Sequence, residues 1–225
     1  MLVSTKGIIL RFTKYRETSI IVNIYTEALC LNSYIVNGVR SSKSKYKIGY
    51  FEPLNLVELT AYHKPGRNID RISEIRTAYP IHNIRQDIYK STISMFIVEV
   101  LNKCIIEQDK NQPLFDYLYE AIIALNEAKE NNSFHLQFLL ELTKYLGFGI
   151  HDPNTFVQLS NNVRFYDDPE TRRILKRLLE ADFSNAPQMT PEQRTNILND
   201  IVHYFYTHLE MPKLKSLEIL RTIFK

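Results

Sequence analysis

The sequence has few of the residues that build disulfide frameworks or metal centres. Only two of its 225 residues are cysteines, Cys30 and Cys104. Two cysteines cannot form a disulfide framework, and a thiolate-rich zinc site would need histidines to complete it. His203 and His208 are five residues apart, about 140° around a helix, so they cannot chelate one ion as an i, i+4 pair does. We therefore expect no metal ion, no cofactor and two buried, apolar cysteines.

Long apolar runs are also missing. No stretch approaches the roughly 20 residues that a helix needs to cross a bilayer. The N-terminal segment MLVSTKGIILRFTKYRE lacks the order of basic, apolar and small residues of a signal peptide. A content of 44% hydrophobic and 24% charged residues is typical of soluble globular proteins, and the length allows one or two domains. We expect a cytoplasmic protein with no membrane partner.

Motifs that carry catalysis are absent as well. Gly147-Phe148-Gly149 follows an expected helix instead of joining a strand to one, so it is better explained as a helix stop than as a phosphate loop. His151-Asp152 has no serine or cysteine nucleophile in a recognisable turn beside it, and P-loop, kinase and zinc-hydrolase motifs do not occur. We expect no catalytic residues and no enzymatic activity.

What the sequence does contain is a basic first third. Residues 1–80 hold 12 Lys and Arg against 6 Asp and Glu, whereas residues 81–225 hold 16 against 19. The stretch 37–47, NGVRSSKSKYK, has four cations, serine hydroxyls, a glycine and Tyr46 as a stacking surface, with no acid among them. Such a loop is suited to phosphate contacts, although a solvated turn has the same composition. The predicted DNA-binding residues are these four cations and three at the first strand–strand loop: Arg40, Lys43, Lys45, Lys47, Arg11, Lys14 and Arg16.

Residues 1–80 have the pattern of β-strands. Five runs rich in β-branched and aromatic residues are separated by short polar or Gly/Pro links; they span 7–12, 18–26, 29–36, 54–62 and 69–79. In the second run, Ile20, Val22 and Ile24 alternate with Ile21, Asn23 and Tyr25, so its two faces differ. Five short strands predict a small closed barrel, either of the OB type that binds single strands or of the SH3-like type.

After Tyr79-Pro80 the apolar residues recur at helical spacing. One helix is predicted from Ile84 to Ile105. The other helices are expected to start at Asn111-Gln112-Pro113, Ser133, Asp168-Pro169, the capping box Thr190-Pro191-Glu192-Gln193 and Pro212. These starts and ends give helices over 111–125, 134–146, 168–179, from 190 onward and after 212. We therefore predict an α+β protein: a barrel domain at 1–80 and an all-α bundle at 81–225.

Four segments occur in the order KGIILRFTKYRETSIIVNIYT, NGVRSSKSKYKIGYFEPLNLVEL, FLLELTKYLGF and HLEMPKLKSLEIL. In this order they resemble the bacterial RecO family of recombination mediators, over nearly the whole chain. The residues that carry the resemblance are the Tyr-Arg-Glu at 15–17, Gly38, Arg40, Ser44, Lys45, Lys215 and Ser216.

The resemblance implies an N-terminal OB barrel that binds single- and double-stranded DNA without sequence preference, and a helical domain that contacts partner proteins. It implies pairing with RecR, action on gaps coated by single-stranded-DNA-binding protein, help in loading RecA and annealing of strands, in the cytoplasm at the nucleoid. Many relatives carry a four-cysteine zinc module after the helix matching 134–146. The segment here, HDPNTFVQLSNNVRFYDDPE, has no cysteine, so we expect the zinc module to be absent.

The resemblance also implies docking of the acidic, hydrophobic-ended tail of single-stranded-DNA-binding protein. Such a tail needs a cation beside an apolar pocket. The densest basic cluster after residue 80 is Arg172, Arg173, Lys176 and Arg177, with Ile174, Leu175 and Leu178 expected to offer apolar surface. The same pattern fits the solvated face of an ordinary amphipathic helix.

Two other functions stay open on the sequence. A basic barrel could serve an RNA-binding adaptor, because phosphate contacts and stacking do not distinguish the sugars. If the helical half dominates, the chain is a protein-interaction scaffold that does not bind DNA.

Overall fold

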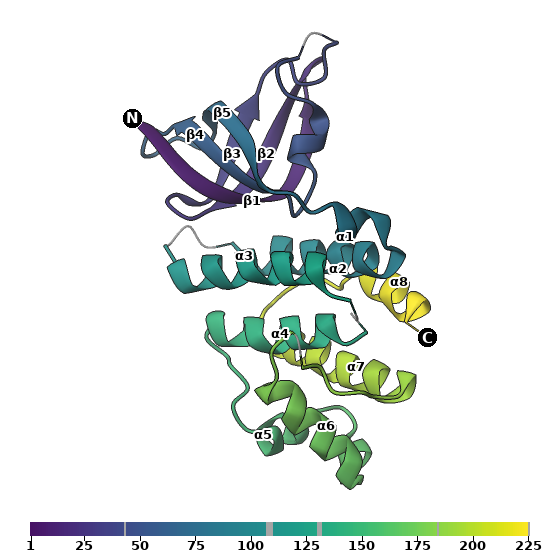
Figure 1. Ribbon diagram of the computed structural model, residues 1–225. Helices are drawn as coiled ribbons and strands as arrows, with labels where there is room; N and C mark the ends of the chain where they lie inside the picture. The colour runs from purple at the N-terminus through teal and green to yellow at the C-terminus, as the bar shows by residue number, and fades with distance from the viewer. Residues whose placement is uncertain (43, 107–109, 130–131, 184, 225) are drawn as a thin grey trace. The chain divides into compact units, whose positions relative to one another are not determined.

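Five strands close into a barrel in the computed structural model, which describes residues 1–42, 44–106, 110–129, 132–183 and 185–224 (Figure 1). The strands are β1 (Leu2–Tyr15), β2 (Ser19–Thr26), β3 (Cys30–Val36), β4 (Leu56–Tyr62) and β5 (Asp70–Tyr79). Around the barrel their order is β1-β2-β3-β5-β4, with β3 and β5 parallel and the other neighbours antiparallel. This is the OB order, so the OB-type prediction is confirmed and the SH3-like alternative is wrong.

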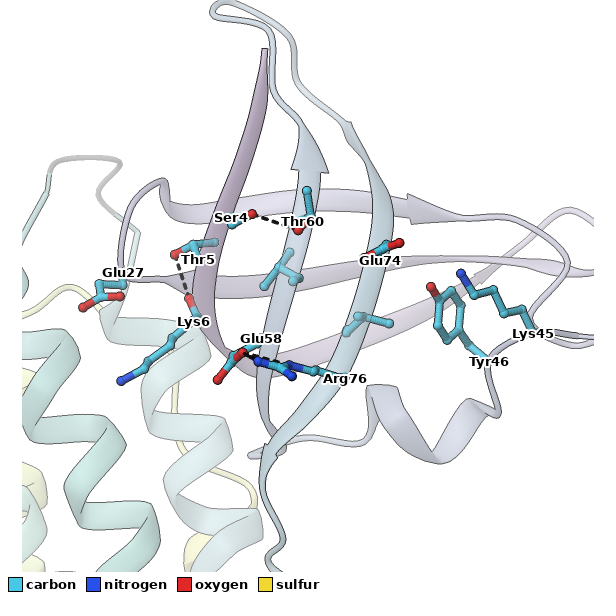
Figure 2. Close-up of a pocket in the computed structure, with 12 residues that line it drawn as sticks. Ser4, Thr5, Lys6, Glu27, Lys45, Tyr46, Glu58, Thr60, Glu74 and Arg76 are labelled. Atoms are coloured by element: carbon cyan, nitrogen blue, oxygen red, sulfur yellow. Dashed lines mark hydrogen bonds and ion pairs between the residues drawn. The ribbon is translucent and has the colours of Figure 1, made fainter.

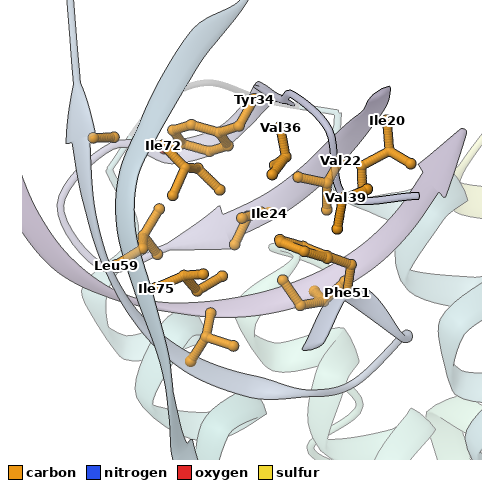
Figure 3. Packing of buried hydrophobic residues seen from close by; sticks show 13 residues of the cluster. Ile20, Val22, Ile24, Tyr34, Val36, Val39, Phe51, Leu59, Ile72 and Ile75 are labelled. Carbon is orange, nitrogen blue, oxygen red and sulfur yellow. The ribbon is translucent and has the colours of Figure 1, made fainter. Parts of the chain in front are cut away.

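The barrel interior is filled by alternate residues of every strand. Figure 3 shows this core, which includes Ile9, Ile20, Val22, Ile24, Tyr34, Val36, Leu59, Ile72 and Ile75. Burying one aliphatic side chain fully stabilises a fold by about 1.5–3 kcal/mol. Gly7 lets β1 pass close to this core, because a Cβ there would lie 2.7 Å from Ile24 Cγ2 and 3.0 Å from Leu59 Cδ2. The alternation turns the odd-numbered residues of β2 away from the barrel interior.

The chain after β3 closes one end of the barrel. A loop leads to the short 3₁₀ helix η1 (Ile48–Phe51), and both Val39 in the loop and Phe51 in η1 are buried against the core residues. Two apolar anchors therefore hold the basic stretch 37–47 to the barrel.

The helices are α1 (His82–Gln86), α2 (Ile88–Cys104), α3 (Gln112–Glu127), α4 (Phe134–Tyr145), α5 (Pro153–Gln158), α6 (Pro169–Glu180), α7 (Pro191–His208) and α8 (Ser216–Ile223). A second 3₁₀ helix, η2 (Val163–Asp167), precedes α6. None of the helices in the described ranges is long and apolar enough to span a membrane.

Asp87 corrects one prediction. A single helix was expected from Ile84 to Ile105, but the Asp87 carboxylate accepts hydrogen bonds from the backbone N–H groups of Tyr89 (2.7 Å) and Lys90 (3.0 Å) and so caps a new helix, α2. The capping predictions at Asp168 and Thr190 are confirmed. Asp168 caps α6 and Thr190 forms a capping box with Gln193 at α7.

Contacts divide the chain into two compact units. Unit 1 comprises Met1–His82 and Ile105–Ile123, and unit 2 comprises Asn83–Cys104 and Ala124–Lys225. In unit 1, Tyr25 packs against Phe115 of α3 with 6.0 Å between ring centroids, and Gln112 donates to Glu27 (3.1 Å). The division of the chain into functional domains at 1–80 and 81–225 stays a prediction.

Within unit 2, a carboxylate holds the last helix. Glu99 of α2 accepts hydrogen bonds from the backbone N–H groups of Lys215 (2.9 Å) and Ser216 (2.8 Å), from Ser216 Oγ (2.6 Å) and from Lys103 Nζ (2.8 Å). The Lys215-Ser216 pair noted in the sequence therefore has a structural role, because it begins α8 and attaches it to α2.

A buried carboxylate anchors the segment between α5 and α6. Tyr166 of η2 is fully buried and donates from its hydroxyl to Asp200 of α7 (2.8 Å), which also accepts from the Asn161 N–H (3.1 Å). Arg172 Nε donates to the Tyr166 carbonyl (2.7 Å). The segment without cysteines is therefore held by hydrogen bonds to α7 and α6.

Candidate nucleic-acid interface

The turn between β1 and β2 presents Arg16. This residue has φ 51°, in the left-handed region, and its guanidinium lies over the Tyr15 ring at 5.2 Å. Because the planar guanidinium stacks on the ring, an exposed cation is partly fixed at the rim of the barrel.

The basic stretch after β3 returns to this turn. The Arg40 backbone N–H donates to the Thr18 carbonyl (2.9 Å), and Arg40 Nη1 donates to the Arg16 carbonyl (3.3 Å). Ser19 Oγ donates to Asn37 Oδ1 (3.2 Å) at the start of the stretch. Two of the predicted cations, 24 positions apart in the sequence, are therefore held together at one rim of the barrel.

Arg11 reaches the same outer surface through an irregularity in β1. Ile9 belongs to the core, so strict alternation would turn Arg11 inward as well. A register shift between Ile9 and Arg11 places Arg11 opposite Asn23 and Phe12 opposite Val22. Phe12 then packs on the core, and Arg11 is exposed on the outside.

Cross-strand pairing continues this surface around the barrel. The aligned residues Thr13, Ile21, Ile35, Arg71 and Tyr62 come from β1, β2, β3, β5 and β4 in turn. Ile21 and Ile35 are half-buried, and Arg71 is exposed. We call the outer surface of these strands, with Arg11, Arg16, Arg40, Arg71, Ile21, Ile35, Asn23 and Ser33, the arginine face; none of these positions is acidic.

Arg71 was missed in the sequence analysis. It reaches the arginine face only because β5 pairs with β3, a long-range contact that the local pattern does not contain. The position of Asn23, by contrast, follows from the alternation in β2.

Three further predicted cations lie outside the arginine face as defined above. Lys14 is exposed near the end of β1, and Lys47 is exposed at the start of η1. Lys45 lies over the Tyr46 ring at 5.1 Å, and its pKa is raised by the interaction with Tyr46 and then by Glu74. Lys43 lies outside the described residues.

Lys45 and Tyr46 line a depression of about 660 Å³ on the outer surface of β1, β4 and β5 (Figure 2). Its cations are matched by carboxylates: the depression also contains Lys6, Arg76, Glu27, Glu58 and Glu74, and Arg76 is ion-paired with Glu58. This surface carries both signs of charge, so it is less suited to a polyanion than the arginine face.

The cluster predicted for a protein partner lies on α6. Ile174, Leu175 and Leu178 are core residues, at most 3% exposed, so the expectation that they offer apolar surface is wrong. The amphipathic helix buries them to attach α6. Arg173 pairs with Glu170 (2.8 Å), and Arg177 is exposed.

The other two cations of α6 line a cavity. Arg172 and Lys176 border a space of about 310 Å³, together with Asp152, Pro153, Asn154 and Val157. The apolar part of this cavity comes from α5, which begins at Pro153 after the Asp152 cap. Asp152-Pro153 is the same helix-start signal as Asp168-Pro169, so the start of α5 can also be predicted from the sequence.

Within the ranges that the structure covers, no three His, Cys, Asp or Glu side chains are grouped to hold an ion.

The fold places the chain among proteins that join an OB barrel to a set of helices. Two family models match it: "Recombination protein O N terminal" over residues 1–81 and "Recombination protein O C terminal" over residues 85–151. Curated relatives match over the full length of both chains. Proteins named DNA repair protein RecO are 36% identical in Flavobacterium psychrophilum, 37% in Flavobacterium johnsoniae and 34% in Bacteroides fragilis. The chain belongs to the RecO family of DNA repair and recombination proteins.

Proposed function

We propose that the arginine face binds single- and double-stranded DNA without sequence preference. The observation that carries this proposal is the meeting of Arg16 and Arg40 at one rim, with Arg11 and Arg71 on the same outer surface. Arginines bind phosphates in a bidentate manner, and phosphate contacts do not read the bases.

The half-buried Ile21 and Ile35 lie between these arginines. These apolar side chains give unpaired bases a surface that excludes water, while the cations contact the phosphate backbone of the DNA. A surface of this kind accepts a single strand of any sequence, and its cations also accept the phosphates of a duplex.

Fluorescence anisotropy with labelled oligonucleotides of mixed sequence tests the proposal. We expect binding to single- and double-stranded DNA that weakens steeply as salt rises. A matched RNA competitor separates the RNA-binding alternative: an RNA that displaces DNA at lower concentration than unlabelled DNA does would favour an RNA adaptor. Absent or salt-insensitive binding would favour the scaffold.

The biological role that we propose follows the family. The protein anneals complementary strands and, together with RecR, helps load RecA onto gaps coated by single-stranded-DNA-binding protein, in the cytoplasm at the nucleoid and without catalysis. The cheapest test of the first step is annealing of complementary labelled oligonucleotides, with and without RecR. Acceleration over protein-free strands is the expected result.

We also propose that the cavity between α5 and α6 receives the tail of single-stranded-DNA-binding protein. Arg172 and Lys176 supply cations for its acidic residues, and the half-buried Pro153 supplies an apolar contact for its end. Arg173 and Arg177 do not line this cavity, so the same helix offers a matched control.

A labelled tail peptide titrated against two charge-reversed variants tests this docking. Arg172→Glu/Lys176→Glu should lose peptide binding and keep DNA binding, whereas Arg173→Glu/Arg177→Glu should keep both. Equal affinity of the first variant and the wild type would move the site away from α6.

A further inference from the structure

Arg11 does not extend freely into solvent, because a polar row crosses three strands of the arginine face. Cross-strand pairing aligns Arg11 of β1 with Asn23 of β2, and Asn23 with Ser33 of β3. In the orientation of the Asn23 amide that satisfies both neighbours, its oxygen accepts from Arg11 Nε and Nη2 at 3.2 Å each, and its nitrogen donates to Ser33 Oγ at 3.3 Å. Arg11 can only donate, so it sets this orientation, and Ser33 Oγ accepts from the Asn23 nitrogen.

Two features show that this arrangement depends on local structure. The register shift after Ile9 is what turns Arg11 outward opposite Asn23. Asn23 is half-buried between its neighbours, while Arg11 is exposed. Apart from the two bonds to Asn23, the other guanidinium N–H groups remain available as donors.

Fixing an arginine before its ligand arrives has a known physical consequence. A free arginine side chain loses rotamer entropy when it is immobilised on a ligand, and this loss weakens binding. A guanidinium already held in place loses less on binding, so the same phosphate contact yields more affinity.

We propose that Asn23 is a positioning residue that holds Arg11 ready for a phosphate of the bound strand. This inference rests on the proposed DNA-binding function of the arginine face. Asn23 itself makes no contact with the phosphate; it acts through Arg11.

A double-mutant cycle tests the proposal, with affinity for a single-stranded oligonucleotide measured by anisotropy. Asn23→Ala should weaken binding about two- to tenfold, Arg11→Ala should weaken it at least as much, and the double variant should match Arg11→Ala alone. Asn23→Thr, which favours a strand but is too short to hold both neighbours, should behave like Asn23→Ala. Asn162→Ala, at an exposed position in unit 2, is the matched control and should bind as the wild type does.

A salt series gives a second readout, because it distinguishes the loss of a phosphate contact from the loss of the residue that positions Arg11. Arg11→Ala should lower the log–log slope by about 0.7, whereas Asn23→Ala should leave the slope unchanged, because Arg11 still reaches its phosphate. The positioning role is overturned if Asn23→Ala binds DNA as tightly as the wild type does. It is also overturned if adding Asn23→Ala to the Arg11→Ala variant weakens binding as much as adding it to the wild type. If Arg11→Ala itself binds DNA normally, the failure belongs to the proposed face, and the positioning role is overturned with it.

Discussion

His135 is buried in α4 with neither ring nitrogen bonded to a described protein atom. Burial, and then the charge of Arg194, lowers its pKa to about 3. The imidazole is therefore neutral in the folded protein, whereas in the unfolded chain it takes up a proton near pH 6.5. The unfolded state binds the extra proton, so this residue lowers the stability as the pH falls from 6.5 toward 3.

We predict that His135→Phe stabilises the protein and flattens its response to acid. Removing unpaired buried polar atoms should raise the free energy of unfolding by roughly 1 kcal/mol at pH 7, with a larger gain at pH 5. Urea unfolding at both pH values measures this, and the exposed His82→Phe variant serves as a control. An equal pH dependence in His135→Phe and the wild type would contradict the account.

Glu99 has the opposite titration. Its burial opposes ionisation, but hydrogen bonds from Lys103, Ser216 and Lys215 lower its pKa to about 2, from 4.5. The folded state holds the carboxylate charged, so its contribution is complete above pH 4.5 and is lost as the pH falls to about 2.

Glu99→Gln should therefore cost about 1–3 kcal/mol at pH 7, since several donors lose a charged acceptor. Thermal unfolding from pH 7 to pH 2 should show the difference from wild type shrinking below pH 4.5. Glu210→Gln, at an exposed position, controls for the loss of one charge. A difference that stays constant down to pH 2 would mean that Glu99 does not hold α8 by its charge.

At the scale of elements, the loop 37–47 contributes to two surfaces. Arg40 is bonded to the β1–β2 turn, whereas Lys45 borders the depression with Glu74. If all four loop cations bound phosphates, their joint loss would lower the salt slope by roughly three units. The structure favours a smaller contribution to the salt slope from Lys45 than from Arg40.

We predict that Arg16→Ala/Arg40→Ala lowers the slope on single-stranded DNA by about 1.4 for every sequence tested. Lys45→Ala/Lys47→Ala removes the same charge and should lower it by less than half as much. The reverse ranking would move the interface to the surface of β1, β4 and β5.

The elements also show how far local pattern reaches. Alternation in β2 and the helix-start signals at Asp168 and Thr190 predicted those elements, because their determinants lie within a few residues. The split at Asp87 depends on a side chain that caps instead of continuing a helix, and the pattern of apolar residues does not reveal it. The location of Arg71 depends on β3–β5 pairing, and the separation of Lys45 from Arg40 depends on how the loop is anchored by Val39 and Phe51.

At the scale of the whole molecule, the expected absence of the zinc module leads to a prediction about the folded chain. Hydrogen bonds among Tyr166, Asp200 and Arg172 hold the segment in which many relatives carry four cysteines. Elemental analysis of purified protein should find no stoichiometric zinc, and a chelator should leave the circular dichroism unchanged. One molar equivalent of tightly bound zinc, or unfolding on chelation, would overturn this.

The central claim is that the arginine face, and no other surface of unit 1, binds DNA. The most direct measurement is a salt series on single-stranded DNA for two triple variants that each remove three cations. Arg11→Ala/Arg16→Ala/Arg71→Ala should weaken binding and lower the log–log slope by about 2 units, whereas Lys6→Ala/Lys45→Ala/Arg76→Ala should bind nearly as the wild type does. If the second variant loses as much slope as the first, or if the first binds with the slope of the wild type, the arginine face is not the DNA-binding surface.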